Sequence, residues 1–322
     1  MNIFVTGANG FIGRNLCVFL KDKGYFVRGA VRNNVRDVSG VDEYIQVGDI
    51  NESTDWQQAL AGVDTVIHLA ARVHIMNVLA VNSVEEFRKV NVFGTERLAQ
   101  MAVKAGVRRF IFLSSIGVNG EFTDRKLFTE DSIPNPVGAY AVSKWEAEQS
   151  LRKVLENNAM EIVILRAPLV YGLDAPGNFA RLMRLIKVGI PLPFSNINNL
   201  RSFIYLGNLV DVIVTCITHP LAVGETFLVS DGQDVSTPDL IKIIASAMNK
   251  KTVLFSLHPG ILKALCRVVG KSEELEKLTG TLLVDSSKIR SLLGWKPSFT
   301  LEEGIKKTVK EVGIASALRA SQ

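Results

Sequence analysis

The sequence predicts an α/β protein with a doubly wound parallel sheet and a smaller C-terminal domain. Two observations lead to this fold class. In the first half of the chain, short β-rich runs alternate with segments whose apolar residues recur at helical spacing. A glycine-rich turn also joins the first run directly to the first helical segment. Parallel strands need crossover connections, and the helices in those connections cover both faces of the sheet.

The expected strands and helices alternate in this way as far as Arg166. Strands are expected at 3–6, 26–31, 44–47, 65–69, 110–113 and 161–165, and helices at 11–23, 84–105 and 138–155. Beyond Arg166 the chain becomes rich in turns, and 204–217 and 227–229 are expected to return to the sheet before a helix at 237–248. We therefore expect one domain over 1–167, with returns near 203–230, and a second that is mainly 168–322.

Composition narrows the class of protein. The chain has 322 residues, of which 47% are hydrophobic and 21% charged, as in a globular protein. Its charge-free stretches are shorter than the roughly 18 residues that span a bilayer, so no membrane insertion is expected. The net charge of +5 is spread along the chain without a basic block between aromatics, which argues against nucleic acid. The four histidines show no ligand spacing, so no metal is expected, and no leader is visible, which favours a cytoplasmic protein.

The glycine-rich turn reads Thr6-Gly7-Ala8-Asn9-Gly10-Phe11-Ile12-Gly13. Glycines at this point let the backbone turn sharply and approach a pyrophosphate at the start of a helix. The turn therefore predicts a Rossmann-like NAD(P)-binding domain over 1–167, and a substrate-binding role for the C-terminal domain. The expected cofactor contacts here are Gly7, Asn9, Gly10, Phe11, Ile12 and Gly13.

The end of the second strand bears on the choice of dinucleotide. A carboxylate there usually binds the ribose hydroxyls of NAD, whereas an arginine can bind the 2′-phosphate of NADP. This chain has Val31-Arg32-Asn33, with an arginine and no carboxylate. Arg32 is either a cofactor contact or a solvated surface residue. We expect NAD or NADP, with NADP favoured.

Three side chains form a candidate catalytic set. Tyr140 and Lys144 lie four residues apart in an expected helix and so share one face, and Ser115 closes the fifth strand. A phenol of pKa about 10 is a poor base at neutral pH, but a nearby ammonium favours its ionised form. Tyr140 could then exchange a proton with a sugar hydroxyl while hydride moves at the same carbon. Lys144 would also hold the nicotinamide ribose, and Ser115 would hydrogen-bond the reacting oxygen.

Together these features resemble the extended short-chain dehydrogenase/reductase family, specifically its NAD-dependent nucleotide-sugar epimerase/dehydratase members. The resemblance covers nearly the whole chain. Its motifs are Val47–Ile50, His68–Ala71, Val90–Thr95, Leu165–Gly172, Arg201–Tyr205, Val284–Lys288 and Leu293–Pro297. It implies cofactor contacts from Asp49, Ile50, Leu69, Ala70, Ala71 and Pro168, and substrate contacts from Asn178, Arg201 and Leu282. The arginine would bind the nucleotide diphosphate, because guanidinium and phosphate pair in a bidentate manner.

The chain departs from the family pattern at several positions. The usual Val-Tyr-Gly is Val118-Asn119-Gly120, and only Lys277 lies near the position of a second phosphate-binding arginine. Some family members that reject N-acetylated sugars carry a bulky tyrosine where this chain has Leu282. The smaller side chain implies room for a 2-acetamido group.

The resemblance implies an NAD(P)-dependent oxidoreductase acting at C4 of a UDP-hexose. The favoured interpretation is 4-keto reduction of a UDP-N-acetyl-6-deoxyhexosamine of the UDP-N-acetylquinovosamine type, in surface-polysaccharide biosynthesis. The alternative is a UDP-glucose or UDP-N-acetylglucosamine 4-epimerase, whose NAD never leaves. A non-catalytic NADPH-sensing protein is a second alternative, opposed by the complete set Ser115, Tyr140 and Lys144. A homodimer is a family expectation.

Overall fold

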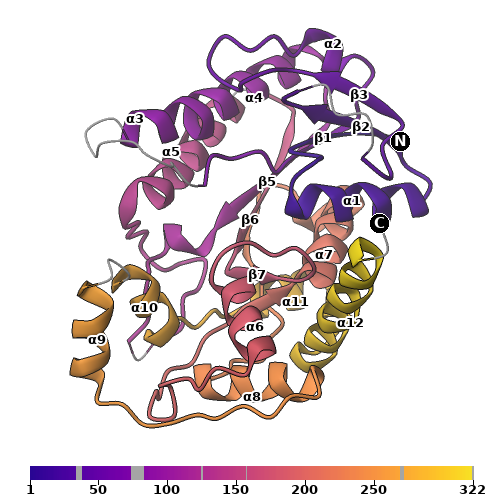
Figure 1. Ribbon diagram of the computed structural model, residues 1–322. Helices are drawn as coiled ribbons and strands as arrows, with labels where there is room; N and C mark the ends of the chain where they lie inside the picture. Colours follow the sequence, from indigo (N-terminus) through magenta and orange to yellow (C-terminus); the bar gives the residue numbers. More distant parts are fainter. Residues whose placement is uncertain (34–37, 74–82, 125, 157, 269–271, 321–322) are drawn as a thin grey trace.

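A seven-stranded parallel sheet forms the centre of the fold in the computed structural model, which describes residues 1–33, 38–73, 83–124, 126–156, 158–268 and 272–320 (Figure 1). The strand order is β3-β2-β1-β4-β5-β6-β9. The strands are β1 (Asn2–Thr6), β2 (Phe26–Val31), β3 (Glu43–Gln46), β4 (Thr65–His68), β5 (Arg109–Ser115), β6 (Glu161–Ala167) and β9 (Thr226–Leu228). The order reverses direction between β1 and β4, where ligands bind in doubly wound sheets.

Alternation of side chains along the strands builds a core on each face of the sheet. Ile3 and Val5 of β1 point to one face, where α1 (Phe11–Asp22) and α7 (Leu206–Thr218) pack. Phe4 points to the other face. That face is covered by α2 (Gln57–Leu60), α4 (Gly94–Lys104) and α5 (Gly138–Leu155). The predicted α/β, doubly wound, Rossmann-like parallel sheet is therefore confirmed.

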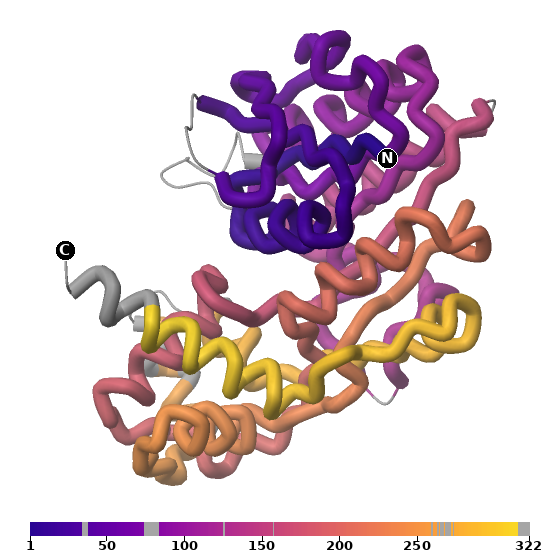
Figure 2. The backbone as a smooth tube through the Cα atoms, turned by 90° about the vertical axis from the view of Figure 1, so that its right-hand side faces the viewer, coloured from indigo at the N-terminus to yellow at the C-terminus, as the bar shows by residue number. Residues whose placement is uncertain are grey.

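A second apolar core lies in the C-terminal part of the chain. It is built on a two-stranded parallel sheet, β7 (Leu169–Tyr171) with β8 (Phe203–Tyr205). Its helices are α6 (Asn178–Val188), α8 (Thr237–Ala247), α9 (Pro259–Val268), α10 (Ser272–Thr279) and α12 (Leu301–Ala320), whereas α11 (Ser287–Leu293) packs against the first core. Figure 2 shows this part on one side of the molecule and the indigo N-terminal strands and helices on the other.

The prediction that 204–217 returns to the main sheet was wrong. Only Phe203–Tyr205 is extended, and it pairs with β7 outside the main sheet, while Leu206–Thr218 is helix α7 beside α1. The buried side chains Leu209, Ile213 and Cys216 recur at helical spacing. A nearly continuous apolar run does not distinguish a buried helix from a buried strand. The expected return near 227–229 is confirmed by β9, which pairs with β6.

The long helix expected over 84–105 is interrupted. α3 (Ser83–Arg88) passes into a π-helical turn, Lys89–Phe93, before α4 begins. Such turns occur frequently at functional sites. None of the helices in the described part of the chain combines the length and apolar character needed to cross a membrane.

Candidate active site

A cleft of about 1580 Å³ runs between the two cores. One end is lined by the glycine-rich turn and the carboxyl ends of β1, β2 and β4, and the other by α6, α10 and the segments around Arg201 and Leu282. Sixteen predicted site residues line it: Gly7, Asn9, Gly10, Phe11, Ile12, Gly13, Arg32, Ile50, Leu69, Ala70, Ala71, Ser115, Tyr140, Asn178, Arg201 and Leu282. Residues that lie far apart in the sequence thus meet in one place.

The glycine-rich turn requires glycine at two positions. Gly7 adopts φ +68°, in the left-handed region, and Gly13 lies so near the turn that an added Cβ would stand 2.1 Å from the carbonyl oxygen of Gly7. α1 then begins at Phe11. No described side chain caps its amino end, and its first turn has no acidic residue. Gly10, Phe11, Ile12 and Gly13 line the cleft, so this uncapped helix end can bind an anion there.

Arg32 and Asp49 are ion partners at the end of β2. Arg32 Nε lies 3.0 Å from Asp49 Oδ1, and both side chains are largely exposed. Arg32 lines the cleft, whereas Asp49 does not and its neighbours Gly48 and Ile50 do. Arg32 thus has an anionic partner from the segment after β3.

The three predicted catalytic residues come from two neighbouring elements. Ser115 ends β5 and its Oγ accepts a hydrogen bond of 3.1 Å from the Gly117 amide, and Tyr140 lies in the first turn of α5. Both line the cleft. Lys144 lies one turn further along α5 and is buried, with its Nζ 3.9 Å from the centroid of the Phe112 ring.

Burial dominates the protonation of this site. It raises the pKa of Tyr140 to about 12 and lowers the pKa of Lys144 to about 7, while the nearby carboxylate of Glu148 raises that of Lys144. The expected lowering of the Tyr140 pKa is therefore not seen in the protein by itself. Desolvation of the buried phenolate is the cause of the raised pKa of Tyr140.

His68 lies in the layer beneath the glycine-rich turn. Its ring nitrogens bond Thr6 Oγ1 at 2.6 Å and Thr95 Oγ1 at 2.8 Å, and Thr6 Oγ1 accepts from the Ala70 amide at 3.2 Å. Burial, with the positive charge of Lys144, lowers the pKa of His68 to about 3. A neutral His68 therefore holds the ends of β1 and β4 at the cofactor half of the cleft.

Asn91 braces the start of α5 from the π-helical turn. Its Nδ2 donates to Ser143 Oγ at 2.9 Å, and Ser143 Oγ donates to the carbonyl of Tyr140 at 2.7 Å. Asn91 Oδ1 also accepts from the Arg72 amide at 2.8 Å. The resemblance pointed to Asn91, but the part played by Ser143 was missed, because a serine inside a helical pattern gives no distinguishing signal.

The substrate half is organised around Arg201. Its backbone forms bridges to Val235 and Leu282, and its Nη1 donates to the Gly280 carbonyl at 3.0 Å. Burial lowers the pKa of Arg201 to about 10, so the guanidinium stays charged at neutral pH and is poorly hydrated. Asn178 opens α6 on the same side of the cleft.

Three predicted contacts do not line the cleft: Asp49, Lys144 and Pro168. Pro168 is buried between β6 and β7, and Leu169 and Val170 line the wall instead. Sequence reasoning also missed Glu121 and Phe122, which line the substrate half. They lie in an irregular segment after β5, where no periodicity indicates direction. Among the described residues no cluster of His, Cys, Asp or Glu could hold a metal ion.

Comparison with known proteins gives concordant matches. The profile of the NAD dependent epimerase/dehydratase family matches residues 3–230. A UDP-glucose 4-epimerase from Vibrio cholerae is 45% identical over 313 residues, covering 96% of this chain and 94% of the relative. Two solved structures share the fold at 24% identity and a TM-score of 0.78, each covering 98% of this chain. One is the UDP-glucose 4-epimerase of Thermotoga maritima in complex with UDP-glucose, and the match covers 100% of that chain. The other is the UDP-glucuronic acid 4-epimerase of Bacillus cereus in complex with NAD, and the match covers 99% of that chain.

Proposed function

The chain belongs to the NAD-dependent epimerase/dehydratase family, and we propose that it is a UDP-hexose 4-epimerase that keeps its NAD bound throughout turnover. The observation that carries this proposal is the 45% identity, over nearly the full length of both chains, to the Vibrio cholerae UDP-glucose 4-epimerase. The cleft supports it, because Ser115 and Tyr140 line the same cleft as the glycine-rich turn and Arg201.

The cofactor half of the cleft fits a dinucleotide. The turn at Gly7 and Gly13 leaves no space for side chains, and the uncapped start of α1 presents N–H donors to a pyrophosphate. Arg32, Ile50 and the segment Leu69–Ala71 would line the adenosine and ribose portions. Bound NAD would supply the acceptor for the C4 hydride and return that hydride to the opposite face of the sugar.

The chain's own residues bind the sugar nucleotide and move one proton. Arg201 would bind the diphosphate, since a poorly hydrated guanidinium pairs well with phosphate oxygens. Ser115 would hydrogen-bond the reacting oxygen at C4, and Tyr140 would take its proton and later return it. The raised pKa of Tyr140 means that positive charge must favour its phenolate, and Lys144, one turn further along α5, would supply it.

The epimerase alternative is preferred to the 4-ketoreductase interpretation that the sequence favoured. That interpretation depended on Arg32 as a free 2′-phosphate ligand and on the missing acid in β2. Arg32 instead pairs with Asp49, whose carboxylate would repel a 2′-phosphate. The Bacillus cereus structure is a complex with NAD, which supports NAD over NADP as the cofactor.

Purified protein should convert UDP-galactose to UDP-glucose without added cofactor. The product is measured with a coupled UDP-glucose dehydrogenase after heat inactivation of the epimerase, and bound dinucleotide is released by acid and identified. We expect turnover together with NAD at close to one equivalent per chain. A protein that is inactive on both UDP-hexoses but reduces a UDP-4-keto sugar with added NADPH would overturn the proposal in favour of the ketoreductase.

A further inference from the structure

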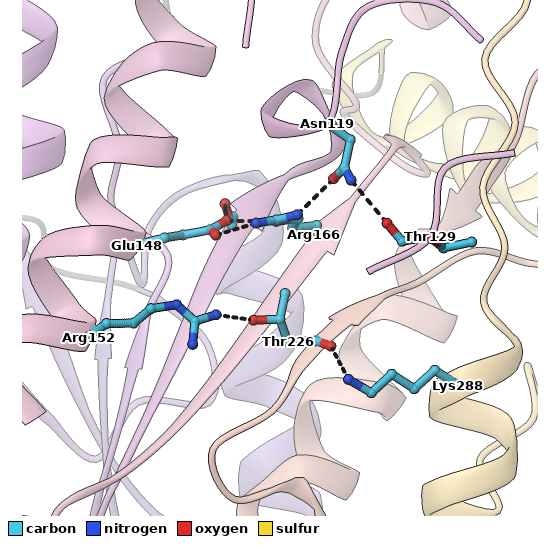
Figure 3. Close-up of polar contacts among 8 residues, drawn as sticks. Asn119, Thr129, Glu148, Arg152, Arg166, Thr226 and Lys288 are labelled. Atoms are coloured by element: carbon cyan, nitrogen blue, oxygen red, sulfur yellow. Dashed lines mark hydrogen bonds and ion pairs between the residues drawn. The ribbon is translucent and has the colours of Figure 1, made fainter. Parts of the chain in front are cut away.

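A buried carboxylate lies one turn beyond Lys144 on α5. Glu148 is completely buried, and its Oε1 accepts hydrogen bonds from Ser114 Oγ at 2.5 Å and from Arg166 Nε at 3.0 Å. Its Oε2 accepts from Arg166 Nη2 at 2.6 Å. Arg166 in turn donates from Nη1 to Asn119 Oδ1 at 3.0 Å, as Figure 3 shows. Both charges of this pair are therefore shielded from water, and each makes three hydrogen bonds.

The pair joins the elements that carry the candidate catalytic residues. Ser114 directly precedes Ser115 on β5, and Arg166 lies opposite Ser114 on the neighbouring strand β6. Glu148 lies on α5, which carries Tyr140 and Lys144 in its first two turns. One carboxylate thus fixes α5 to the strand ends that form the wall of the cleft.

The amino end of α5 needs such an anchor. Its N-cap, Val137, provides no side-chain hydrogen bond, and its first turn has no acidic residue among those described. Asn91 holds the helix through Ser143 from the side of the π-helical turn. Glu148 holds it from the side of the sheet.

We propose that Glu148, clamped by Arg166 and Ser114, is a positioning residue that sets the place of Tyr140 and Lys144 relative to Ser115. This inference rests on the proposed function for its catalytic consequence, but the anchoring itself can be measured without turnover. A displacement of about 1 Å in a catalytic group can lower the rate as much as ~100-fold.

The test uses a double variant, because Glu148→Gln alone leaves the Arg166 guanidinium buried without a counter-charge and can unfold the protein. The double variant Glu148→Gln with Arg166→Met removes both charges, and such replacements often preserve folding. We expect it to fold, with its amides over 138–148 exchanging hydrogen at least ~10-fold faster than in the wild type and those of α4 unchanged. We expect kcat to fall ~10-fold or more, with KM for the UDP-hexose nearly unchanged.

The same two strands offer a matched control at their opposite ends. Arg109 Nε pairs with Glu161 Oε2 at 2.7 Å, and Arg109 also donates to the carbonyls of Cys216, Ile217 and His219. In Glu161→Gln the Arg109 guanidinium keeps its three carbonyl acceptors, so exchange over 138–148 and kcat should stay at wild-type values. A folded double variant with wild-type exchange there, or with wild-type kcat, would overturn the inference. A wild-type protein without epimerase activity would instead overturn the proposed function, while the exchange data would still decide whether Glu148 anchors α5.

Discussion

Arg32 Nε lies 3.0 Å from Asp49 Oδ1 at the end of β2, so an arginine that lines the cleft beside the glycine-rich turn already has an anionic partner. An exposed pair of this kind contributes little to stability. The pair matters for the proposed cofactor, because a carboxylate next to Arg32 would oppose the 2′-phosphate of NADP and would accept a hydrogen bond from the 2′-hydroxyl of NAD.

Asp49→Asn should therefore shift cofactor preference towards NADP. One charge a few ångströms away in water is worth about 1 kcal/mol, or about fivefold in affinity. Calorimetric titration of protein stripped of cofactor would measure both dinucleotides. Arg32→Ala is the opposing control and should weaken NADP more than NAD. Equal changes for the two cofactors in both variants would show that neither residue contacts the 2′ position.

Tyr140→Phe should nearly abolish epimerisation while the fold and NAD content stay unchanged. The substitution removes the hydroxyl that exchanges the proton but almost no volume, and general acid–base groups contribute about 10²–10⁴-fold. Turnover of UDP-galactose and release of bound NAD are the two measurements. A variant that keeps half of the wild-type rate would exclude Tyr140 as the proton-transfer group.

The fold, and most of the residues that line the glycine-rich end of the cleft, were predictable because their signals are local. The turn Gly7–Gly13 and the pair Tyr140 and Lys144 each lie within one short segment, and alternating apolar runs define the strands. The Glu148–Arg166 pair was not predictable, since two residues 18 apart on different elements meet only when α5 packs on the sheet. The error at 204–217 has the same origin, because tertiary packing decides whether a continuous apolar run becomes a helix.

His68 should make stability fall with acid. Its pKa of about 3 in the folded protein is below its ordinary value of 6.5, so between these values the unfolded chain binds a proton that the folded protein does not. The free energy of unfolding should thus decrease as pH falls from 6.5 towards 3, by at most about 1.4 kcal/mol per pH unit from this group.

Denaturant unfolding across this pH range would measure the slope. His68→Gln should flatten it relative to the wild type, whatever its effect on stability at pH 7. If the wild type and His68→Gln have the same slope, His68 does not remain neutral in the folded protein.

Leu282 should determine whether the cleft accepts a 2-acetamido group. It lines the substrate half next to Arg201, with which it forms a backbone bridge, and its side chain is 5% exposed. A leucine leaves space that the ring of a tyrosine would occupy. Leu282→Tyr should therefore lower kcat/KM for UDP-N-acetylglucosamine by about 1–3 kcal/mol, or about 5–150-fold, as overpacking commonly does. The kcat/KM for UDP-glucose, which has a plain 2-hydroxyl, should fall much less.

Steady-state kinetics on this pair of substrates, which differ only at C2, tests the prediction, with Leu282→Met as the control of similar volume. Equal losses on both sugars would show that Leu282 supports the wall of the cleft without selecting the substituent at C2.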